Sequence, residues 1–312
     1  MQRKFNKSSK SSKFDKAREP QRAPRARKIE VKEPNTLLAF LIARLDGQSK
    51  SSVKSLLSNR QISVNGDVTK QFDQPLQAGD IVSVSFERGK MEFKHPLLRI
   101  VWEDEYLMLV EKRSGLLSVA TDREKERTAI NILSQYVIKN DPQNRIFILH
   151  RLDKDTSGLL MFAKDRMTQN NMQNNWNDVI TQRTYVAVVE GTPEKETDVI
   201  SNFLQQNAGM KMYVAENGTE AVTRYNIVKG NGRYTQVELN LETGRKNQIR
   251  AHMESIGHPI AGDPKYGANT NPAGRLMLHA RNLSFIHPVS GEELKFISSI
   301  PPVFNAVVKK TV

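Results

Sequence analysis

The stretch RIFILHRLDKDTSGLLMFAKD, residues 145–165, places a short polar segment between two apolar runs. The apolar runs predict two buried strands, and the polar residues 150–157 predict the loop that joins them. Rigid strands hold the ends of such a loop while its side chains reach solvent, which makes it a candidate catalytic platform. The alternative interpretation is that Asp153 and Asp155 are ordinary turn residues, which is the commoner role of Asp in loops. A metal site built on His150 and Asp153 lacks a third ligand nearby.

The chain after Pro96 contains many strand patterns and few helical ones. Further strands are predicted at LRIVWED, YLMLVEK, TYVAVVEG, TRYNIVKG and RYTQVELNLE. Apolar residues at helical spacing occur in ERTAINILSQYVIK, DRMTQNNMQNNWNDVIT and NQIRAHMESIG. Many strands interrupted by few helices predict an α+β domain with a mixed, mainly antiparallel sheet over residues 91–312, rather than a regular β-α-β winding.

A smaller unit is predicted over residues 35–90. Apolar residues at helical spacing within residues 37–57 predict two short helices. Asn65-Gly66 in ISVNGDV predicts a tight turn between two strands, and GDIVSVSFE predicts a closing strand. The order of helix, helix, turn and strand indicates a small α+β domain.

Residues 1–34 are predicted to form a disordered basic arm. They contain almost no large apolar side chains, so burial cannot offset the entropy lost on ordering. Residues 1–35 hold twelve Lys and Arg against four Asp and Glu, and thus supply most of the net charge of +13. The arm is interpreted either as a non-specific RNA tether or as a solvated tail.

The composition narrows the class of protein. A sequence pI near 9.8 indicates a polyanionic partner, with membrane surfaces and simple solubility as rival explanations. The absence of cysteine excludes disulfides, a thiolate nucleophile and a thiolate zinc site. No apolar stretch approaches the ~20 residues that span a bilayer. We therefore expect a soluble cytoplasmic monomer with no obligate protein partner.

The segment HRLDKDTSGLLMFAKD resembles the signature of the RluA-type RNA pseudouridine synthases, HRLD followed by TSGL. RTYVAVVEG, EAVTRY, LETGRKNQIRAHM, GHPIAGDPKYG and LMLHARNLSFIHP resemble later motifs of that family in the same order. Two departures occur. Glu111-Lys112-Arg113 replaces the common Asn-Lys-Pro, and Lys246-Asn247 replaces the common Thr-His. The change at Asn247 is expected to weaken or alter a local hydrogen bond.

The resemblance implies an isomerase that breaks the N1–C1′ bond of uridine, turns the base and joins C5 to C1′, without cofactor or metal. It implies Asp153 as the catalytic carboxylate, Arg250 as its cationic partner and Tyr185 as the ring that stacks on the target base. Arg151 matches an arginine that fills the gap left by the flipped base, and Arg245 is a further candidate RNA contact. The sequence leaves open whether the carboxylate attacks the sugar, attacks the base or removes a ribose proton.

Residues 36–88 resemble the S-four type RNA-binding domain, which is named after a ribosomal small-subunit protein. The resemblance implies RNA contacts from basic side chains on the second helix and the following turn. These side chains are Lys50, Lys54, Arg60 and Lys70. Each of them taken alone is also ordinary solvated surface.

Two other functions are considered. A non-catalytic RNA-binding or ribosome-assembly factor would be favoured if the Asp, Tyr or Arg were missing, and all three positions are filled. A metal-dependent nuclease would need a compact ligand cluster, and the sequence contains none. The chemistry requires no histidine, so His150, His252 and His279 are interpreted as structural or RNA-contacting. Large-subunit ribosomal RNA is the favoured substrate, with transfer RNA as the alternative.

Overall fold

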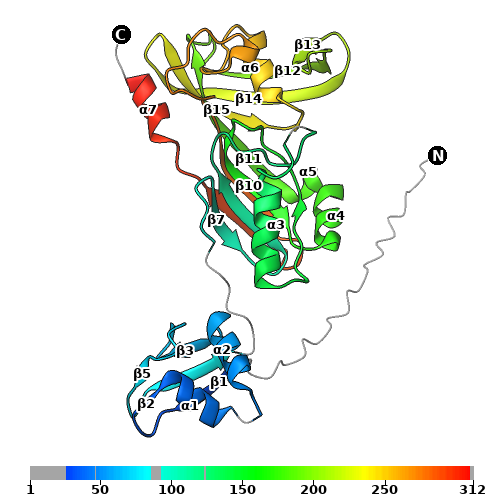
Figure 1. Ribbon diagram of the computed structural model, residues 1–312. Coiled ribbons are helices and arrows are strands. Elements are labelled where there is room, and N and C mark those ends of the chain that lie inside the picture. Colours follow the sequence, from blue (N-terminus) through cyan, green and yellow to red (C-terminus); the bar gives the residue numbers. More distant parts are fainter. Residues whose placement is uncertain (1–25, 46, 86–92, 123, 310–312) are drawn as a thin grey trace, which may run out of the picture. The chain divides into compact units, whose positions relative to one another are not determined.

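A computed structural model describes residues 26–45, 47–85, 93–122 and 124–309 (Figure 1). The chain divides into two compact units, residues 1–90 and residues 91–312. The longest helix in the described residues has 12 residues, and none has the length and apolarity that crossing a membrane requires.

The first unit combines two helices with a small sheet. Its helices are α1 (Leu37–Arg44) and α2 (Lys50–Ser58), and its strands are β1 (Ala26–Glu30), β2 (Asn35–Thr36), β3 (Ile62–Val64), β4 (Asp67–Val68), β5 (Pro75–Leu76) and β6 (Ile81–Ser85). The order β1-β6-β3-β4 forms one sheet, and β2 pairs with β5. Asn65 and Gly66 both have positive φ, as the predicted tight turn between β3 and β4 requires.

The predicted disordered arm of residues 1–34 is wrong for its last residues. Residues 1–25 lie outside the described residues. Strand β1 pairs antiparallel with β6, and Val31 is buried against the helices of the first unit. Ile29 packs beside it, so the alternating apolar residues supply enough buried surface to order this segment despite its basic neighbours.

The second unit is built on an eleven-stranded sheet. Nine strands follow the order β13-β12-β14-β15-β11-β16-β10-β8-β7, with β17 paired to β16 and β9 paired to β10. The β10–β16 pair is parallel and the other pairs are antiparallel. The predicted mixed, mainly antiparallel sheet is therefore confirmed. The strands are β7 (Leu98–Glu103), β8 (Leu107–Lys112), β9 (Phe147–Ile148), β10 (Ser157–Ala163), β11 (Ile180–Glu190), β12 (Thr197–Gln206), β13 (Met212–Ala215), β14 (Thr219–Gly230), β15 (Tyr234–Leu241), β16 (Leu278–Ile286) and β17 (Glu293–Ile297).

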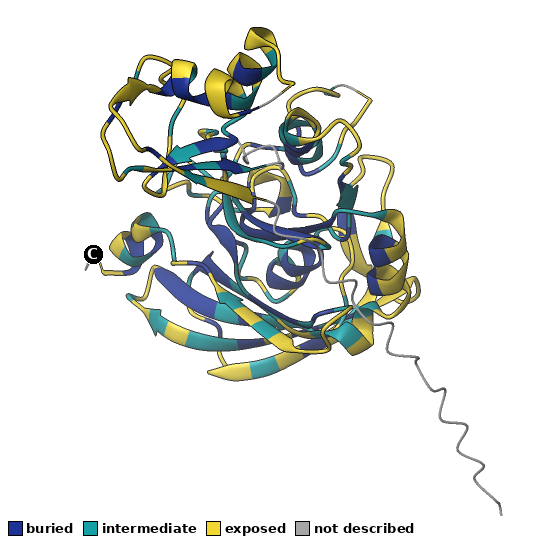
Figure 2. Cartoon of the chain, turned by 90° about the horizontal axis from the view of Figure 1, so that it is seen from below, coloured by how far each residue is buried: buried dark blue, intermediate teal, exposed yellow. Residues whose placement is uncertain are grey.

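Helices pack on the sheet and complete the core (Figure 2). They are α3 (Ala129–Asn140), α4 (Arg166–Asn174), α5 (Trp176–Val179), α6 (Gln248–Ser255), the 3-10 turn η1 (Pro264–Tyr266) and α7 (Pro302–Lys309). The predicted helix DRMTQNNMQNNWNDVIT is interrupted at Asn175, and its last residues already belong to β11. Strand β16, which no sequence pattern predicted, lies at the middle of the sheet beside β10 and β11.

Gly158 fixes the start of β10 against β16. Its φ is +115°, and an added Cβ would lie 2.1 Å from the carbonyl oxygen of Ala280. No larger side chain fits between these paired strands. The polar loop that precedes β10 is thereby held at the end of a central strand, which β16 separates from β11.

Candidate active site

Asp153 lies in the loop between β9 and β10, and main-chain contacts hold this loop firmly. The Ser118 hydroxyl donates to the Leu152 carbonyl at 2.7 Å and accepts from the Leu152 amide at 3.0 Å. The Gly115 amide donates to the Lys154 carbonyl at 2.9 Å. These bonds join the loop to the segment after β8, so the backbone of Asp153 has little freedom.

Lys112 reinforces the loop from inside the protein. Its side chain is fully buried, and its Nζ donates to the carbonyls of Leu116 at 2.8 Å and Lys154 at 3.0 Å. Burial lowers the pKa of Lys112 to about 7, while the charges of Asp155 and Asp153 oppose that shift. From the sequence, Lys112 was noted only as part of a departure from the family pattern. Its role in holding the Asp153 loop was not predicted.

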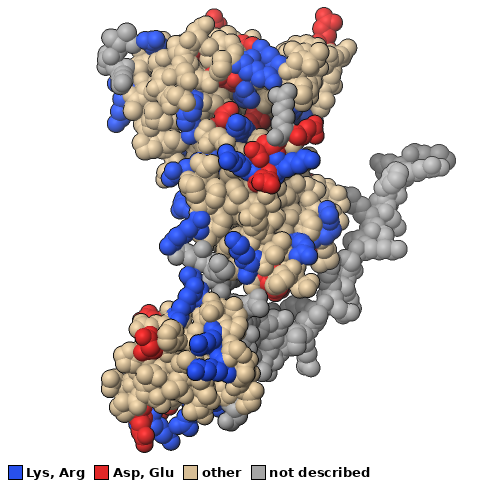
Figure 3. Space-filling view, viewed as in Figure 1, with Lys and Arg blue, Asp and Glu red and all other residues tan. Residues whose placement is uncertain are grey.

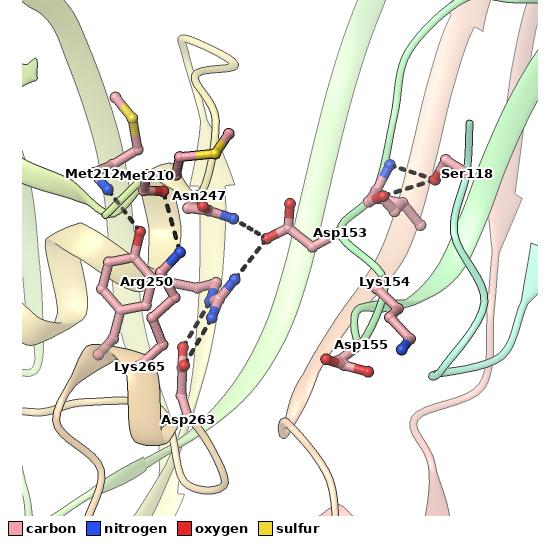
Figure 4. A network of polar contacts seen from close by, with 12 residues as sticks. Ser118, Asp153, Lys154, Asp155, Met210, Met212, Asn247, Arg250, Asp263 and Lys265 are labelled. Atoms are coloured by element: carbon pink, nitrogen blue, oxygen red, sulfur yellow. Dashed lines mark hydrogen bonds and ion pairs between the residues drawn. The ribbon is translucent and has the colours of Figure 1, made fainter. Parts of the chain in front are cut away.

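The carboxylate of Asp153 is bound at one oxygen (Figure 4). Arg250 Nη1 lies 3.2 Å from Oδ2, and the Asn247 amide donates to the same oxygen at 2.5 Å. No described residue donates to Oδ1. Because both donors use Oδ2, they orient the carboxylate and leave Oδ1 free for a substrate.

Asp263 and Tyr266 hold the Arg250 side chain in place. Its Nε and Nη2 donate to the two carboxylate oxygens of Asp263 at 2.7 and 2.8 Å, and its guanidinium lies 4.6 Å from the ring centre of Tyr266. Burial alone would lower the pKa of Arg250, but the hydrogen bonds and charge of Asp263, with the charge of Asp153, raise it. Arg250 therefore stays charged and points one nitrogen at Asp153. The segment GDPKYG was recognised in the sequence as part of a family motif, but no role was predicted for Asp263 or Tyr266.

Asn247 takes the place where the family commonly has histidine. It precedes α6 with φ 50° and ψ 21°, a left-handed conformation that asparagine adopts more readily than most residues. This conformation brings its amide to Asp153. The predicted alteration of a local hydrogen bond thus concerns a direct partner of the candidate catalytic carboxylate.

A cleft surrounds Asp153. A small cavity of about 70 Å³ shares lining residues with two further hollows of about 310 and 360 Å³. All five cleft residues singled out in the sequence line the small cavity, namely Asp153, Arg250, Tyr185, Arg151 and Arg245. Burial raises the pKa of Tyr185 to about 12, so its hydroxyl is neutral at physiological pH.

His150, His252 and His279 all form hydrogen bonds inside the fold, that of His252 Nδ1 with the Thr223 hydroxyl at 2.9 Å. His150 Nε2 accepts from the Met161 amide at 3.1 Å, and burial, with a smaller effect of the Arg183 charge, lowers its pKa to about 3. His279 lies between the hydroxyls of Ser157 and Ser298, at 2.8 and 3.1 Å. Within the described part of the chain, no group of three or more His, Asp or Glu side chains is placed to hold a metal ion.

The RNA contacts predicted in the first unit lie apart in the sequence from the cleft residues. Lys50 and Lys54 are exposed on α2, Lys70 is exposed after β4, and Arg60 is half-buried with φ 58°. Patches of Lys and Arg are visible on the surfaces of both units (Figure 3). The structure describes each unit by itself, so it does not bring these four residues to the cleft.

Comparisons with known proteins agree on one family. Residues 106–255 match the family model described as RNA pseudouridylate synthase. An uncharacterized RNA pseudouridine synthase of Bacillus subtilis is 33% identical over 271 residues, which cover 84% of this chain and 89% of the relative. Ribosomal large subunit pseudouridine synthase D of Vibrio cholerae is 32% identical over 81% of this chain and 84% of its own. Human RNA pseudouridylate synthase domain containing 4 shares the fold, with a TM-score of 0.53 and 23% identity over 66% of this chain and 90% of its own.

Proposed function

The chain belongs to the RNA pseudouridine synthases, which are isomerases, and on this premise we propose that it modifies large-subunit ribosomal RNA with Asp153 as the catalytic residue. The observation that carries the proposal is the orientation of the Asp153 carboxylate. Two donors hold Oδ2, no described residue donates to Oδ1, and Asp153 lines a cleft together with arginines and one tyrosine.

The reaction sets clear demands on that oxygen. The N1–C1′ bond breaks and the C5–C1′ bond forms, the C5 hydrogen leaves to solvent, and N1 gains a proton. Attack on the sugar, attack on the base and removal of a ribose proton all need an ionised oxygen without a competing hydrogen bond. Arg250, anchored by Asp263, places its positive charge beside that carboxylate, 3.2 Å from Oδ2, and leaves Oδ1 without a donor from the described residues.

Tyr185 and Arg151 supply the surroundings that a flipped uridine needs. The neutral Tyr185 ring can stack on the uracil and replace part of the stacking lost when the base leaves its helix. Arg151 is exposed beside Asp153 and can enter the gap left in the RNA. Arg245 adds a further cation for the RNA backbone.

The substrate assignment draws on the relatives. Two of them, from Vibrio cholerae and Zymomonas mobilis, are named ribosomal large subunit pseudouridine synthase D. We also propose that the first unit is an S-four type RNA-binding domain. Its exposed Lys50, Lys54 and Lys70, together with Arg60, would add affinity that depends on salt rather than on sequence. Transfer RNA is the alternative substrate.

Release of tritium from transcripts labelled at uridine C5 tests the proposal. Large-subunit ribosomal RNA and transfer RNA are transcribed in vitro and incubated with the enzyme and a chelator. We expect release from the ribosomal transcript by the wild type and none by Asp153→Asn. Asp155→Asn is the matched control, because Asp155 lies in the same loop without contacting Arg250 or Asn247 (Figure 4).

Each failure has a separate meaning. Release only from transfer RNA would replace the substrate assignment. Full activity of Asp153→Asn would remove Asp153 from catalysis. Equal binding of ribosomal RNA by both proteins, with no release by either, would favour the assembly-factor function.

A further inference from the structure

Arg183 is a half-buried cation without a protein partner in the cleft. It lies on β11 two residues before Tyr185, and among the described residues it has neither a hydrogen bond nor an ion pair. Burial lowers its pKa, since the charged form has lost water without gaining a carboxylate. A cation in this condition costs free energy unless a ligand supplies the missing charge.

Two contacts hold the Arg183 guanidinium in place. Its Cζ lies 5.9 Å from the ring centre of Trp176, whose ring lies 5.4 Å from that of His150. The backbone of Gly244 also lies close, since an added Cβ there would be 2.7 Å from Nη1 of Arg183. The absence of a side chain at Gly244 is therefore what lets the guanidinium occupy this position. These contacts preorganise the group and leave its donors unused.

The surrounding hollow is built for an anion. Its volume is about 360 Å³, and the charged side chains that line it in the described structure are Arg151, Arg183 and Arg245, with no Asp or Glu. It shares Arg151, Tyr185 and Arg245 with the cavity around Asp153. A ligand that fills both spaces would carry its negative charge next to the reacting nucleotide.

We propose that Arg183, seated between Trp176 and Gly244, binds a backbone phosphate of the RNA next to the target uridine. The inference rests on the proposed function and adds a binding site to it. The planar guanidinium matches two phosphate oxygens, and such a contact positions the strand without reading its sequence.

Binding of an unmodified large-subunit ribosomal RNA transcript tests the inference. Kd is measured at several salt concentrations, with Asp153→Asn in every protein so that the transcript is not converted. Adding Arg183→Gln is expected to raise Kd about tenfold and to lower the slope of log Kd against log salt by about one, since one phosphate contact is lost. Arg233→Gln is the matched control, because Arg233 is exposed on the β14–β15 turn, outside the cleft.

Gly244→Ala separates position from charge. Gly244 has no positive φ, so alanine suits the backbone, and its methyl group only displaces the end of the Arg183 side chain. We expect a similar rise in Kd with the net charge unchanged. Since both changes remove one contact, the double variant is expected to bind no more weakly than Arg183→Gln. Thermal unfolding of each variant verifies the fold.

The outcomes are distinct from those of the proposed function. If Arg183→Gln matches Arg233→Gln in Kd and in slope, or if Gly244→Ala binds like its parent, the phosphate site is refuted. Failure of the wild type to release tritium refutes the proposed function, whatever the binding of these variants.

Discussion

Replacing Asn247 with aspartate tests how the Asp153 carboxylate is held. The change keeps the shape of the side chain and puts a second carboxylate beside Oδ2, where the amide now donates at 2.5 Å. At an effective dielectric constant of about 20, two unit charges about 4 Å apart repel by about 4 kcal/mol. That energy corresponds to about 3 pH units. The Asp153 side chain is 24% exposed, so solvent screening reduces the effect, and we expect about 1 to 2 units.

The assay is the pH dependence of kcat/KM for tritium release. In Asn247→Asp the acidic limb is expected to move to higher pH by about 1 to 2 units, because the two neighbouring carboxylates share one proton readily. Asn247→Gly is the control: glycine accepts φ 50° and removes the donor without adding charge, so activity falls and the limb moves by clearly less than in Asn247→Asp. An Asn247→Asp profile superimposable on that of the wild type would refute the reasoning.

Three further predictions concern the same unit. Asp263→Asn leaves Arg250 without its buried partner. We expect it to lower the free energy of unfolding in urea by about 3 kcal/mol and to lower kcat/KM roughly 100-fold. Glu242→Gln is the control, because Glu242 forms an exposed pair with Arg224 and its loss should change the free energy of unfolding by less than about 0.5 kcal/mol. Equal stability of the two variants would contradict this. Tyr185→Leu is expected to raise KM about tenfold or more, whereas Tyr185→Phe should raise it by less than about threefold, because the ring and not the hydroxyl stacks on the base. Equal KM values for the two variants would argue against stacking. Burial lowers the pKa of His150 to about 3 and those of His252 and His279 to about 4, so the unfolded chain binds more protons than the folded one below pH 6.5. The free energy of unfolding is therefore expected to fall on acidification from about pH 6.5 to 4, by up to about 1.4 kcal/mol per pH unit for each histidine. Urea titrations at several pH values should show a weaker pH dependence for His252→Gln.

The local patterns of the sequence predicted much of the fold. The polar loop lies between two strands as expected, although only β10 is buried and the two residues of β9 are half-buried. The Asn65-Gly66 turn has positive φ at both positions, and α6 follows the late motif as expected. Each of these features depends on neighbours in the chain, through apolar alternation or through backbone preferences of single residues. Strand β1 was missed because the basic composition around it outweighed the alternation of Ile29 and Val31.

Features that join distant segments could not be predicted this way. Strand β16 pairs with β10 and β11, which precede it by about 100 residues, and no local pattern specifies such pairings. The same holds for the site, where Asp153, Arg250 and Tyr185 followed from resemblance alone. Their partners Asn247 and Asp263, and the unpaired Arg183 beside them, became visible only through contacts that cross the fold.

The sequence by itself determined the strand-loop-strand platform and the residue types available for chemistry, because both are properties of short segments. The tertiary structure alone decided which oxygen of Asp153 is free, what anchors Arg250 and which arginine lacks a partner. Hydrogen bonds and charges act over a few ångströms in space, and in this site they connect residues that lie up to about 100 positions apart in the chain.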